Sequence, residues 1–202
     1  MPADRLDFSA LEALLLRHER LRSHVRERTL RAGEHVIRQG EACSDIFVLR
    51  AGLVKIYYVT REGKEWVKSF IMDRGVFGSR SAQMAGEGSA FAVVCVEDTS
   101  LAAIPYSVFL EASLQDARLM ETVFRFNEWL GLKKERREYD LLCRSAEERY
   151  RTFVVREAEL AGRLTQVDIA RYLGITPIAL SRIKRRIAER GAAGRPMTAA
   201  ET

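Results

Sequence analysis

The chain has few of the residues that build metal sites and covalent cross-links. Its 202 residues include three histidines and three cysteines, and Cys43, Cys95 and Cys143 stand far apart without a CxxC pair. An odd number of widely spaced cysteines matches neither a disulfide framework nor a zinc site, and it suits a reducing cytoplasm. We interpret all three as reduced, partly buried thiols. A redox-sensing Cys43, in the predicted turn 40–45, is the alternative.

Long apolar runs and a cleavable leader are also missing. No window approaches 18 uninterrupted apolar residues, so the sequence predicts no membrane-spanning helix. The first residues, MPADRLDFSALEALL, include acidic side chains and no apolar stretch ahead of small residues, which argues against a secretory signal. The composition, 47% hydrophobic and 30% charged, is typical of a globular protein. We therefore expect a cytoplasmic protein without a membrane partner.

Excess positive charge is absent from most of the chain and concentrated at its C-terminal end. Residues 1–162 contain 25 basic and 25 acidic side chains, whereas residues 163–202 contain eight basic and three acidic ones. The net charge of +5 therefore falls entirely on the last fifth of the sequence. This asymmetry predicts a domain that binds a polyanion, joined to a neutral body.

The spacing of apolar residues divides the chain into a helix, a β-rich segment and further helices. Helical spacing predicts a helix over residues 9–27, with Ser9 as its candidate N-cap. From about Thr29 to Ile104, glycines separate short apolar runs, which predicts an antiparallel sandwich or barrel such as a jelly roll. The runs are 35–37, 46–49, 53–59, 66–71, 91–96 and 101–104. Residues 61–64 are the predicted tip of a hairpin.

A long helix is predicted after the β-rich segment, from near Tyr106 to about Tyr139. Four apolar residues recur in it with the spacing of a coiled-coil seam. These four are Leu119, Val123, Phe126 and Leu130. The seam packs either on the chain's own β roll or against a second copy in a dimer. Ser145 and Glu148 then form a capping box that predicts another helix.

Residues 165–187 have the pattern of a helix-turn-helix. Thr165 and Asp168 form a capping pair for the first helix, and Gly174 suits a turn that requires positive φ. Thr176 followed by Pro177 is typical of the N-cap and first turn of a second helix. The small residue expected at the helix crossing is Ala170, and the apolar residues expected in the shared core are Ile169, Leu173, Ile175, Leu180 and Ile183.

The outer face of the second helix is polar and basic, which suits the major groove of DNA. We expect Arg182 to contact base edges, because arginine can bond both acceptors of guanine. Lys184, Arg186 and Arg190 are expected to meet phosphates. The predicted DNA-binding residues are Thr165, Gln166, Thr176, Pro177, Ile178, Ser181, Arg182, Lys184 and Arg185. The alternative is a module that signals through protein contacts, but such a docking face would present more apolar or mixed-charge residues.

The order of these elements resembles the CRP/FNR family of transcription regulators. The matching motifs are LRAGE (30–34), QGE (39–41), VLRAGLV (48–54), GVFG (75–78), LGITP (173–177) and LSR (180–182). The resemblance implies an α+β fold with an N-terminal antiparallel β jelly roll, a long dimerisation helix and an all-α helix-turn-helix domain. The expected domain bounds are 1–110, 111–142 and 143–202. It also implies a homodimer that reads a palindromic double-stranded DNA site, an effector pocket in the roll, and RNA polymerase as a candidate partner.

The resemblance places the effector pocket around residues 78–81 and 89–90. Family members that bind cyclic AMP follow Phe-Gly with Glu and show Arg-Ser about ten residues later, whereas Ser79 and Ser89-Ala90 occupy those positions here. A buried phosphate without its arginine would keep its desolvation cost and lose a charge-assisted bond, which argues against cyclic AMP. Arg80 is the candidate for a displaced anion partner. The full predicted pocket is Gly78, Ser79, Arg80, Ser81, Ser89 and Ala90.

Other family features find little support in these residues. The iron–sulfur branch needs clustered N-terminal cysteines, and a haem sensor needs an axial ligand at the roll, so we expect neither cofactor. The usual β wing before the helix-turn-helix falls on residues 156–163, which predict helix and turn, so the wing is reduced or absent. A metal-dependent cupin enzyme would need several His and carboxylate ligands. We therefore predict no catalytic and no metal-binding residues.

Overall fold

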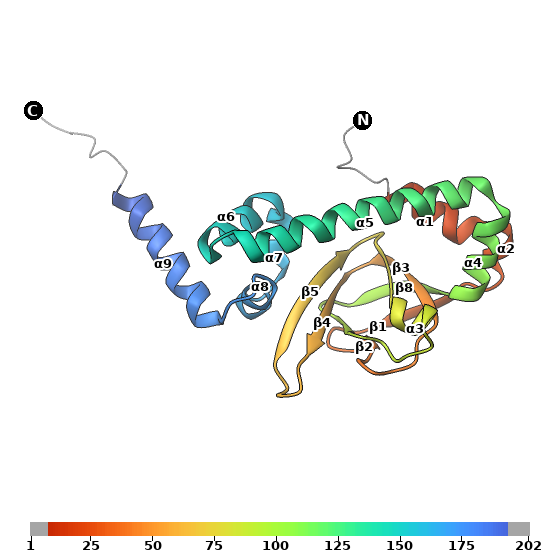
Figure 1. Ribbon diagram of the computed structural model, residues 1–202, viewed down its shortest axis with the longest axis horizontal. Coiled ribbons are helices and arrows are strands. Elements are labelled where there is room, and N and C mark those ends of the chain that lie inside the picture. The colour runs from red at the N-terminus through yellow and green to blue at the C-terminus, as the bar shows by residue number, and fades with distance from the viewer. Residues whose placement is uncertain (1–7, 194–202) are drawn as a thin grey trace, which may run out of the picture. The chain divides into compact units, whose positions relative to one another are not determined.

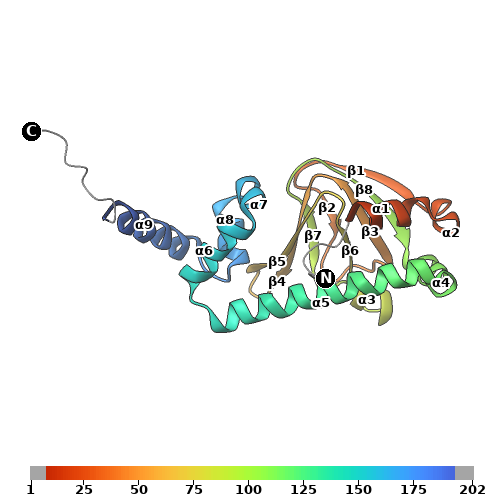
Figure 2. The same ribbon diagram turned by 90° about the horizontal axis from the view of Figure 1, so that it is seen from above.

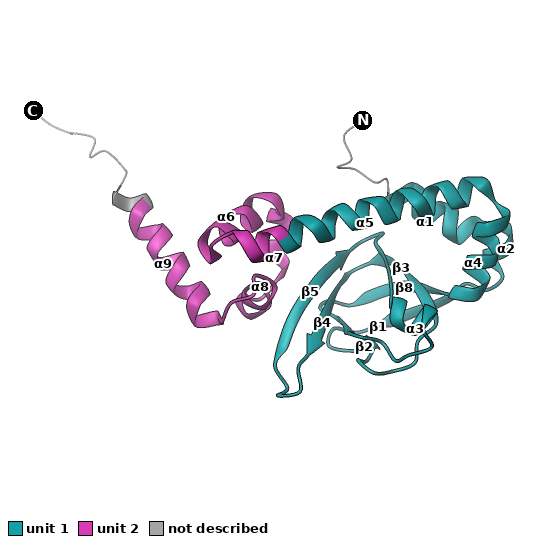
Figure 3. Cartoon of the chain, viewed as in Figure 1, with its two compact units in different colours: residues 1–138 teal, residues 139–202 magenta. Residues whose placement is uncertain are grey.

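The computed structural model describes residues 8–193, and they fall into two compact units. The first unit, residues 1–138, contains all the strands of the described region, and the second, residues 139–202, is helical (Figure 3). The border lies within one long helix, α5 (Ala117–Cys143). No helix among the described residues is long and apolar enough to cross a membrane.

The first unit is a sandwich of two four-stranded antiparallel sheets (Figures 1 and 2). The strand orders are β1-β8-β3-β6 in one sheet and β2-β7-β4-β5 in the other. The strands are β1 (Arg26–Leu30), β2 (His35–Ile37), β3 (Asp45–Ala51), β4 (Leu53–Val59), β5 (Glu65–Met72), β6 (Val76–Gly78), β7 (Ala92–Cys95) and β8 (Thr99–Pro105). Phe47 and Leu49 of the first sheet share a buried core with Val54 and Ile56 of the second. This confirms the predicted jelly-roll class, as a sandwich rather than a closed barrel.

The predicted hairpin tip joins β4 and β5, the most extensively paired strands of the second sheet. The Thr60 N–H donates to the Lys64 carbonyl at 2.9 Å, and the Gly63 N–H donates to the Thr60 carbonyl at 2.9 Å. Gly63 has a φ of 76°, a left-handed conformation that glycine adopts without a side-chain clash. The turn prediction at residues 61–64 is confirmed.

The predicted helix over residues 9–27 is wrong in its extent. The structure has α1 (Phe8–Arg17), α2 (Glu19–Arg22) and then strand β1, and Ser9 lies inside α1 rather than at its N-cap. The His18 ring breaks the helix, because its Nδ1 accepts from the Arg20 N–H at 3.3 Å and its Nε2 lies 3.2 Å from Asp116 Oδ2. The apolar spacing hid this break, since Leu15 and Leu21, on either side of it, are buried in the same core.

The helix predicted from Tyr106 to Tyr139 is also two helices, α4 (Tyr106–Gln115) and α5. Asp116 between them is extended, and its Oδ1 accepts from the N–H groups of Arg118 at 2.8 Å and Leu119 at 3.0 Å. The bond from Leu119, with those from His18 and Arg118, lowers the pKa of the Asp116 carboxyl. A short side-chain cap therefore starts α5, and periodicity alone does not reveal it. A further short helix, α3 (Arg80–Met84), follows β6 and was not predicted.

The second unit consists of α6 (Ala146–Arg156), α7 (Ala158–Arg163), α8 (Gln166–Tyr172) and α9 (Pro177–Ala193), after the end of α5. The predicted capping box opens α6: the Ser145 N–H donates to Glu148 Oε2 at 2.8 Å, and the Glu148 N–H donates to Ser145 Oγ at 3.3 Å. Helix α7 occupies the segment where related proteins would carry a wing, and no strand occurs among residues 139–193.

Candidate nucleic-acid interface

Helix α8 begins at the cap that the sequence predicts. Thr165 Oγ1 accepts from the Asp168 N–H at 3.1 Å, and the Thr165 hydroxyl donates to Asp168 Oδ2 at 2.6 Å. Asp168 is 8% exposed, so this carboxylate is held against the protein rather than offered to a ligand. Ala170, the small residue expected at the helix crossing, is fully buried. The local sequence therefore determines where α8 starts and which side it turns inward.

The turn between α8 and α9 follows the predicted chemistry. Gly174 has a φ of 70°, and the Ile175 N–H donates to the Ala170 carbonyl at 3.0 Å. Thr176 Oγ1 accepts from the Ala179 N–H at 3.2 Å, and Pro177 is the first residue of α9, as an N-cap and first-turn proline require. The predicted core residues that are buried here are Ile169, Leu173, Leu180 and Ile183, while Ile175 is half-buried.

All nine predicted DNA-binding residues are exposed. They are Thr165, Gln166, Thr176, Pro177, Ile178, Ser181, Arg182, Lys184 and Arg185. The start of α8 and the middle of α9 are linked at this surface, because Lys184 Nζ donates to Gln166 Oε1 at 2.8 Å. Ile178 is 67% exposed on the same surface.

Most cations of α9 have a partner within the second unit, and Arg182 differs from them. Lys184 is bonded to Gln166, and Arg185 Nε lies 3.5 Å from Glu189 Oε1. Arg182 makes no hydrogen bond or ion pair with any residue of the described part of the chain. Its guanidinium is therefore available to a ligand without first breaking an internal contact.

Glu147 of α6 changes the expectation for the last two arginines of α9. Its carboxylate lies 3.5 Å from Arg186 Nη1 and 3.4 Å from Arg190 Nη1, and it also accepts from Arg151 at 3.0 Å. The Glu147 side chain is 18% exposed. The phosphate contacts predicted for Arg186 and Arg190 would thus compete with an internal ion pair. The sequence carries no spacing signal for this pairing, because Glu147 and Arg190 are 43 residues apart.

Arg149 is a second residue that sequence reasoning missed. Its Nε donates to the Leu173 carbonyl at 3.0 Å and its Nη1 donates to the Arg144 carbonyl at 2.6 Å. These bonds connect the start of α6 to the end of α8, next to the turn that positions α9. Arg149 therefore supports the interface from behind rather than contributing to its exposed face.

The predicted effector-pocket residues come together at one end of the β sandwich. Ser79 Oγ lies 3.1 Å from Ser81 Oγ, and the Ala90 N–H donates to Ser81 Oγ at 3.2 Å. The Ser89 hydroxyl donates to the Phe91 carbonyl at 2.7 Å, and Ser79 and Ser89 are almost fully buried. Gly78 ends strand β6 beside them. We call residues 79, 81, 89 and 90 the serine cluster; its hydroxyls already have partners within the chain.

Arg80 does not complete an anion site in this cluster. Its guanidinium donates to Asn127 Oδ1 on α5 and lies 4.0 Å from the Met84 sulfur. Arg80 is exposed on α3, whereas the neighbouring Ser79 is buried. Because adjacent residues at the start of this short helix point in different directions, a cation at position 80 cannot replace one at position 89.

The cysteines differ in exposure, being half-buried at Cys43, buried at Cys95 and exposed at Cys143. Burial raises the pKa of the Cys43 thiol, and the nearby carboxylates of Asp45 and Glu41 raise it further. A higher pKa reduces the thiolate fraction at neutral pH, and the thiolate is the reactive form. The geometry therefore favours a structural thiol at Cys43 over a redox sensor.

Comparisons with known proteins agree with this architecture. A family model described as the cyclic nucleotide-binding domain matches residues 27–116. The chain is 25% identical over 177 residues to Electron transport regulator A of Shewanella oneidensis, covering 82% of this chain and 70% of that protein. It is 27% identical over 179 residues to Transcriptional activator protein anr of Pseudomonas aeruginosa, with coverages of 82% and 72%. The structure of FixK2 from Bradyrhizobium japonicum has the same fold, with a TM-score of 0.70 at 22% identity over 87% of this chain and 89% of that one.

The chain contains a cyclic nucleotide-binding domain and is similar over most of its length to transcription regulators of the CRP/FNR family. The resemblance drawn from the motifs at residues 30–54, 75–78 and 173–182 is thereby confirmed, and so is the combination of antiparallel sheets followed by helices. The matched domain ends at residue 116, where α5 begins.

The apolar seam predicted on α5 packs mainly within its own unit. Leu119 is fully buried in a core that also includes Leu11 and Ile104, and Val123 and Phe126 pack against that core. Leu119 therefore cannot face a second copy, which corrects its assignment to a dimer seam. The spacing misled because any helix face that packs on a core shows the same repeat. Leu130 is half-buried, and the exposed apolar residues in this part of α5 are Met120, Phe124 and Leu132.

Proposed function

We propose that this regulator binds palindromic double-stranded DNA as a homodimer, with Arg182 reading a base edge in the major groove. The observation that carries the proposal is the state of Arg182: it is exposed in the second turn of a capped helix and free of internal partners among the described residues. A guanidinium in this state keeps its full set of donors for the two acceptors of guanine.

The neighbouring residues support different contacts. Thr165, Gln166 and Thr176 lie at helix N-termini, where backbone N–H groups and hydroxyls suit phosphate oxygens. Lys184 and Arg185 add charge along the same face, while their bonds to Gln166 and Glu189 limit where they can reach. In this proposal Arg182 specifies the sequence and the others position the helix.

A dimer would pair through the face of α5 that its own unit leaves open. Phe124 is 62% exposed and Met120 is 38% exposed on that face, and Gly131, two turns further along, has open space around it. A glycine allows the backbones of two helices to approach closely. Two copies related by a two-fold axis would place their recognition helices about one DNA turn, roughly 34 Å, apart.

The proposed control of this regulator is an effector other than cyclic AMP. The serine cluster offers no cation to a cyclic phosphate, and its hydroxyls are bonded within the chain. An effector that changed the packing of α5 would change the orientation of the DNA-binding helices in the dimer. The setting would be the cytoplasm, RNA polymerase would be a further partner, and the role is binding rather than catalysis.

The experiment is selection of bound fragments from genomic DNA by the wild type and by Arg182→Ala, side by side and without added effector. We expect the wild type to enrich a palindrome. The Arg182→Ala variant should lose about 1–3 kcal/mol of specific binding, because one bidentate base contact is removed. Arg185→Ala should instead weaken binding to specific and random sequences by the same small factor, since a phosphate contact carries no sequence information.

Arg125→Ala is the control variant, because Arg125 is exposed on α5 and pairs with Glu121 at 2.6 Å, away from the helix-turn-helix. It should enrich the same palindrome as the wild type. An unchanged preference for specific over random DNA in Arg182→Ala would overturn the role of that residue. Enrichment of a non-repeated site would overturn the dimer. Enrichment of nothing by any variant would mean either that an effector is required for DNA binding or that the helix-turn-helix docks proteins.

A further inference from the structure

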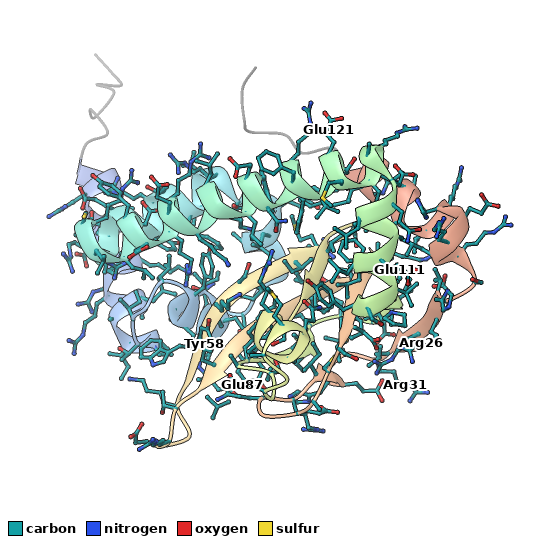
Figure 4. All side chains as sticks on the ribbon, turned by 45° about the vertical axis from the view of Figure 1, so that its right-hand side comes forward. Arg26, Arg31, Tyr58, Glu87, Glu111 and Glu121 are labelled. Atoms are coloured by element: carbon teal, nitrogen blue, oxygen red, sulfur yellow. The ribbon has the colours of Figure 1, made fainter. Side chains whose placement is uncertain are left out.

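An open cleft of about 500 Å³ lies on the second sheet, on the face turned away from the sandwich core. Side chains of a strand alternate between its two faces. On β4, Ile56 packs in the core, so Tyr57 faces outward beside Ala92, its partner on β7. Tyr58, labelled in Figure 4, faces inward again, where its ring centroid lies 6.4 Å from that of the buried Phe91. The floor of the cleft is therefore separate from the core side of the sheet.

A side-chain clamp joins the two segments that form the walls of this cleft. The Val59 N–H donates to Gln39 Oε1 at 2.7 Å, and Gln39 Nε2 donates to the Val59 carbonyl at 3.0 Å. These bonds tie the residues after β2 to the base of the β4–β5 hairpin. Arg38 lies next to the clamp on one wall, and Arg61 lies two residues beyond it on the other. The clamp therefore holds in place the backbone that carries both arginines.

The guanidinium groups of these two arginines have no internal partner. Neither Arg38 nor Arg61 forms a side-chain hydrogen bond or ion pair in the part of the chain that the structure describes. Arg50 of the same unit, by contrast, donates to Glu27 at 2.6 Å. Two exposed guanidinium groups beside one cleft raise the positive potential in it, which favours an anion there.

The carboxylates that follow the two walls in the sequence are bonded to other groups. Glu41 Oε2 accepts from the backbone N–H of Arg38 at 2.9 Å. Glu62 bonds to the hydroxyl of Thr60, which lowers the pKa of the Glu62 carboxyl. None of the residues that line the cleft is acidic. An anion in the cleft would therefore meet the guanidinium groups without a competing carboxylate on its walls.

His35 adds a neutral polar group to the cleft. Its Nε2 lies 2.9 Å from the Tyr57 hydroxyl, and its Nδ1 has no hydrogen-bond partner within residues 8–193. Burial, followed by the charge of Arg38, lowers the pKa of His35, so its ring is neutral at pH 7. Glu65, which opposes this shift, lies 3.9 Å from Lys55 Nζ. The ring can therefore bond a hydroxyl group of a ligand through Nδ1.

We propose that this cleft binds the phosphate monoester of a small hydroxylated molecule. The phosphate oxygens accept from Arg38 and Arg61, whose planar guanidinium groups suit bidentate contacts, and a hydroxyl of the body bonds His35. The volume lies in the range of small-molecule sites. An apolar body would cover the polar side chains around the cleft without giving them partners.

This site is independent of the proposed DNA interface and of the serine cluster. Its lining residues fall between positions 35 and 92, all in the first unit, and none of them belongs to α5 or to residues 79–90. Failure of Arg182 to specify DNA would leave the proposal unchanged, and failure of the phosphate site would leave the DNA interface unchanged.

The test uses the full chain, with glycerol 3-phosphate and ribose 5-phosphate as probes. Glycerol and ribose supply the body alone, and inorganic phosphate supplies the anion alone. At about ten times its Kd, a phosphate ester should raise the Tm by about 3–5 °C. NMR of the three histidine rings locates the site, because His35 lines the cleft and the other two do not. The signals of His35 should move, while those of His18 and His24 should stay unchanged.

Arginine variants test which charges hold the ligand. Arg38→Gln and Arg61→Gln should each weaken binding of the esters about tenfold, because each removes a charge-assisted contact. At the same probe concentration, the Tm shift should then fall to about 1 °C. Arg31→Gln is the matched control and should respond as the wild type does. Arg31, also labelled in Figure 4, is exposed, has no side-chain partner among the described residues and does not line the cleft.

Four results would overturn the proposal. No Tm shift and no change at His35 with either ester would show that the cleft takes no such ligand. An equal shift with glycerol or ribose would show that the phosphate is not recognised. Equal affinity for inorganic phosphate would show that the body is not recognised. An unchanged response in both Arg38→Gln and Arg61→Gln would place the binding elsewhere on the chain.

Discussion

The two units of this protein hold their basic residues in opposite ways. In the helical unit, Glu147 alone is within ion-pair distance of Arg186 and Arg190, and almost every cation of α9 has a neighbour of opposite charge or a hydrogen-bond acceptor. In the β unit, Lys68 lies near Lys133, Lys134 and Arg137 of α5, and burial followed by the charges of these three residues lowers its pKa to about 8. The comparison shows that an unpaired cation is informative only when the charges around it are known. Arg182 stands out because its neighbours are paired, and Lys68 stands out because the charges that lower its pKa are all positive.

The strongest way to sharpen this contrast is to remove the charge of Lys68. The folded state lowers the pKa of Lys68 from 10.5 to about 8, so between these pH values the unfolded chain binds a proton that the folded chain does not. The cost to stability is therefore complete below pH 8 and disappears as the pH rises toward 10.5. We expect Lys68→Met to be more stable than the wild type at pH 7, by up to about 3 kcal/mol, and this advantage to vanish by pH 10.5.

Denaturant unfolding of both proteins in chloride buffers, at several pH values, measures this difference directly. The difference between the two proteins matters here, because other lysines and tyrosines titrate over the same range. Lys64→Met is the matched variant measured over the same pH range, because Lys64 Nζ also lies over an aromatic ring, 4.3 Å from the Trp66 centroid, on the same hairpin. A pH-independent difference for Lys68→Met would show that the folded state does not lower the pKa of Lys68.

A smaller effect is expected from Gly174→Ala in the helical unit, where local backbone chemistry rather than charge is decisive. Gly174 has a φ of 70°, and an added Cβ would lie 3.2 Å from Leu141 Cδ2. The left-handed conformation costs an alanine about 1–2 kcal/mol, and the substitution should lower the free energy of unfolding by that amount. Gly162→Ala is the control, because this helical position has open space and should gain about 0.5–1 kcal/mol. Equal effects of the two substitutions would contradict the role of the turn.

The smallest effect on stability is expected from Glu147→Gln, which removes the acidic partner of Arg186 and Arg190 in the helical unit. Its ion pairs with Arg186 and Arg190 are partly exposed, so the loss should be at most about 1 kcal/mol. DNA binding should become more salt-dependent, because each arginine released to a phosphate adds about one to the slope of log K against log salt. Glu189→Gln releases only Arg185 and should change the slope less. An identical slope in wild type and Glu147→Gln would show that these arginines do not reach DNA.

The helix-turn-helix could be predicted because its rules are local. Each cap joins residues only three positions apart, Thr165 with Asp168 and Thr176 with Ala179, and both caps were confirmed. The positive φ predicted at Gly174 was confirmed as well. The exposure of all nine predicted DNA-binding residues follows from helical periodicity once the inward face is known. Their contacts with DNA stay a prediction.

The errors lie where one pattern fits two structures. Apolar spacing continued through His18 and Asp116, although side-chain bonds break the helix at both. The seam repeat on α5 fits a dimer and an intramolecular core equally well. Leu119, one of the four seam residues, is buried in the intramolecular core. Strand β1, with one buried residue among charged ones, gave almost no apolar signal at the edge of its sheet.

By itself, the sequence determined the order of the elements, the class of the β unit, the position of the helix-turn-helix and the asymmetry of charge. These depend on periodicity, turn chemistry and composition, which act over a few residues. Only the tertiary structure decided which cations are paired: Glu147 meets an arginine 43 positions away, and Arg137 meets the carbonyl beside Lys68 from 70 positions away. Electrostatic interactions depend on distance in space, and chain positions that far apart become neighbours only when the sheets and helices have packed.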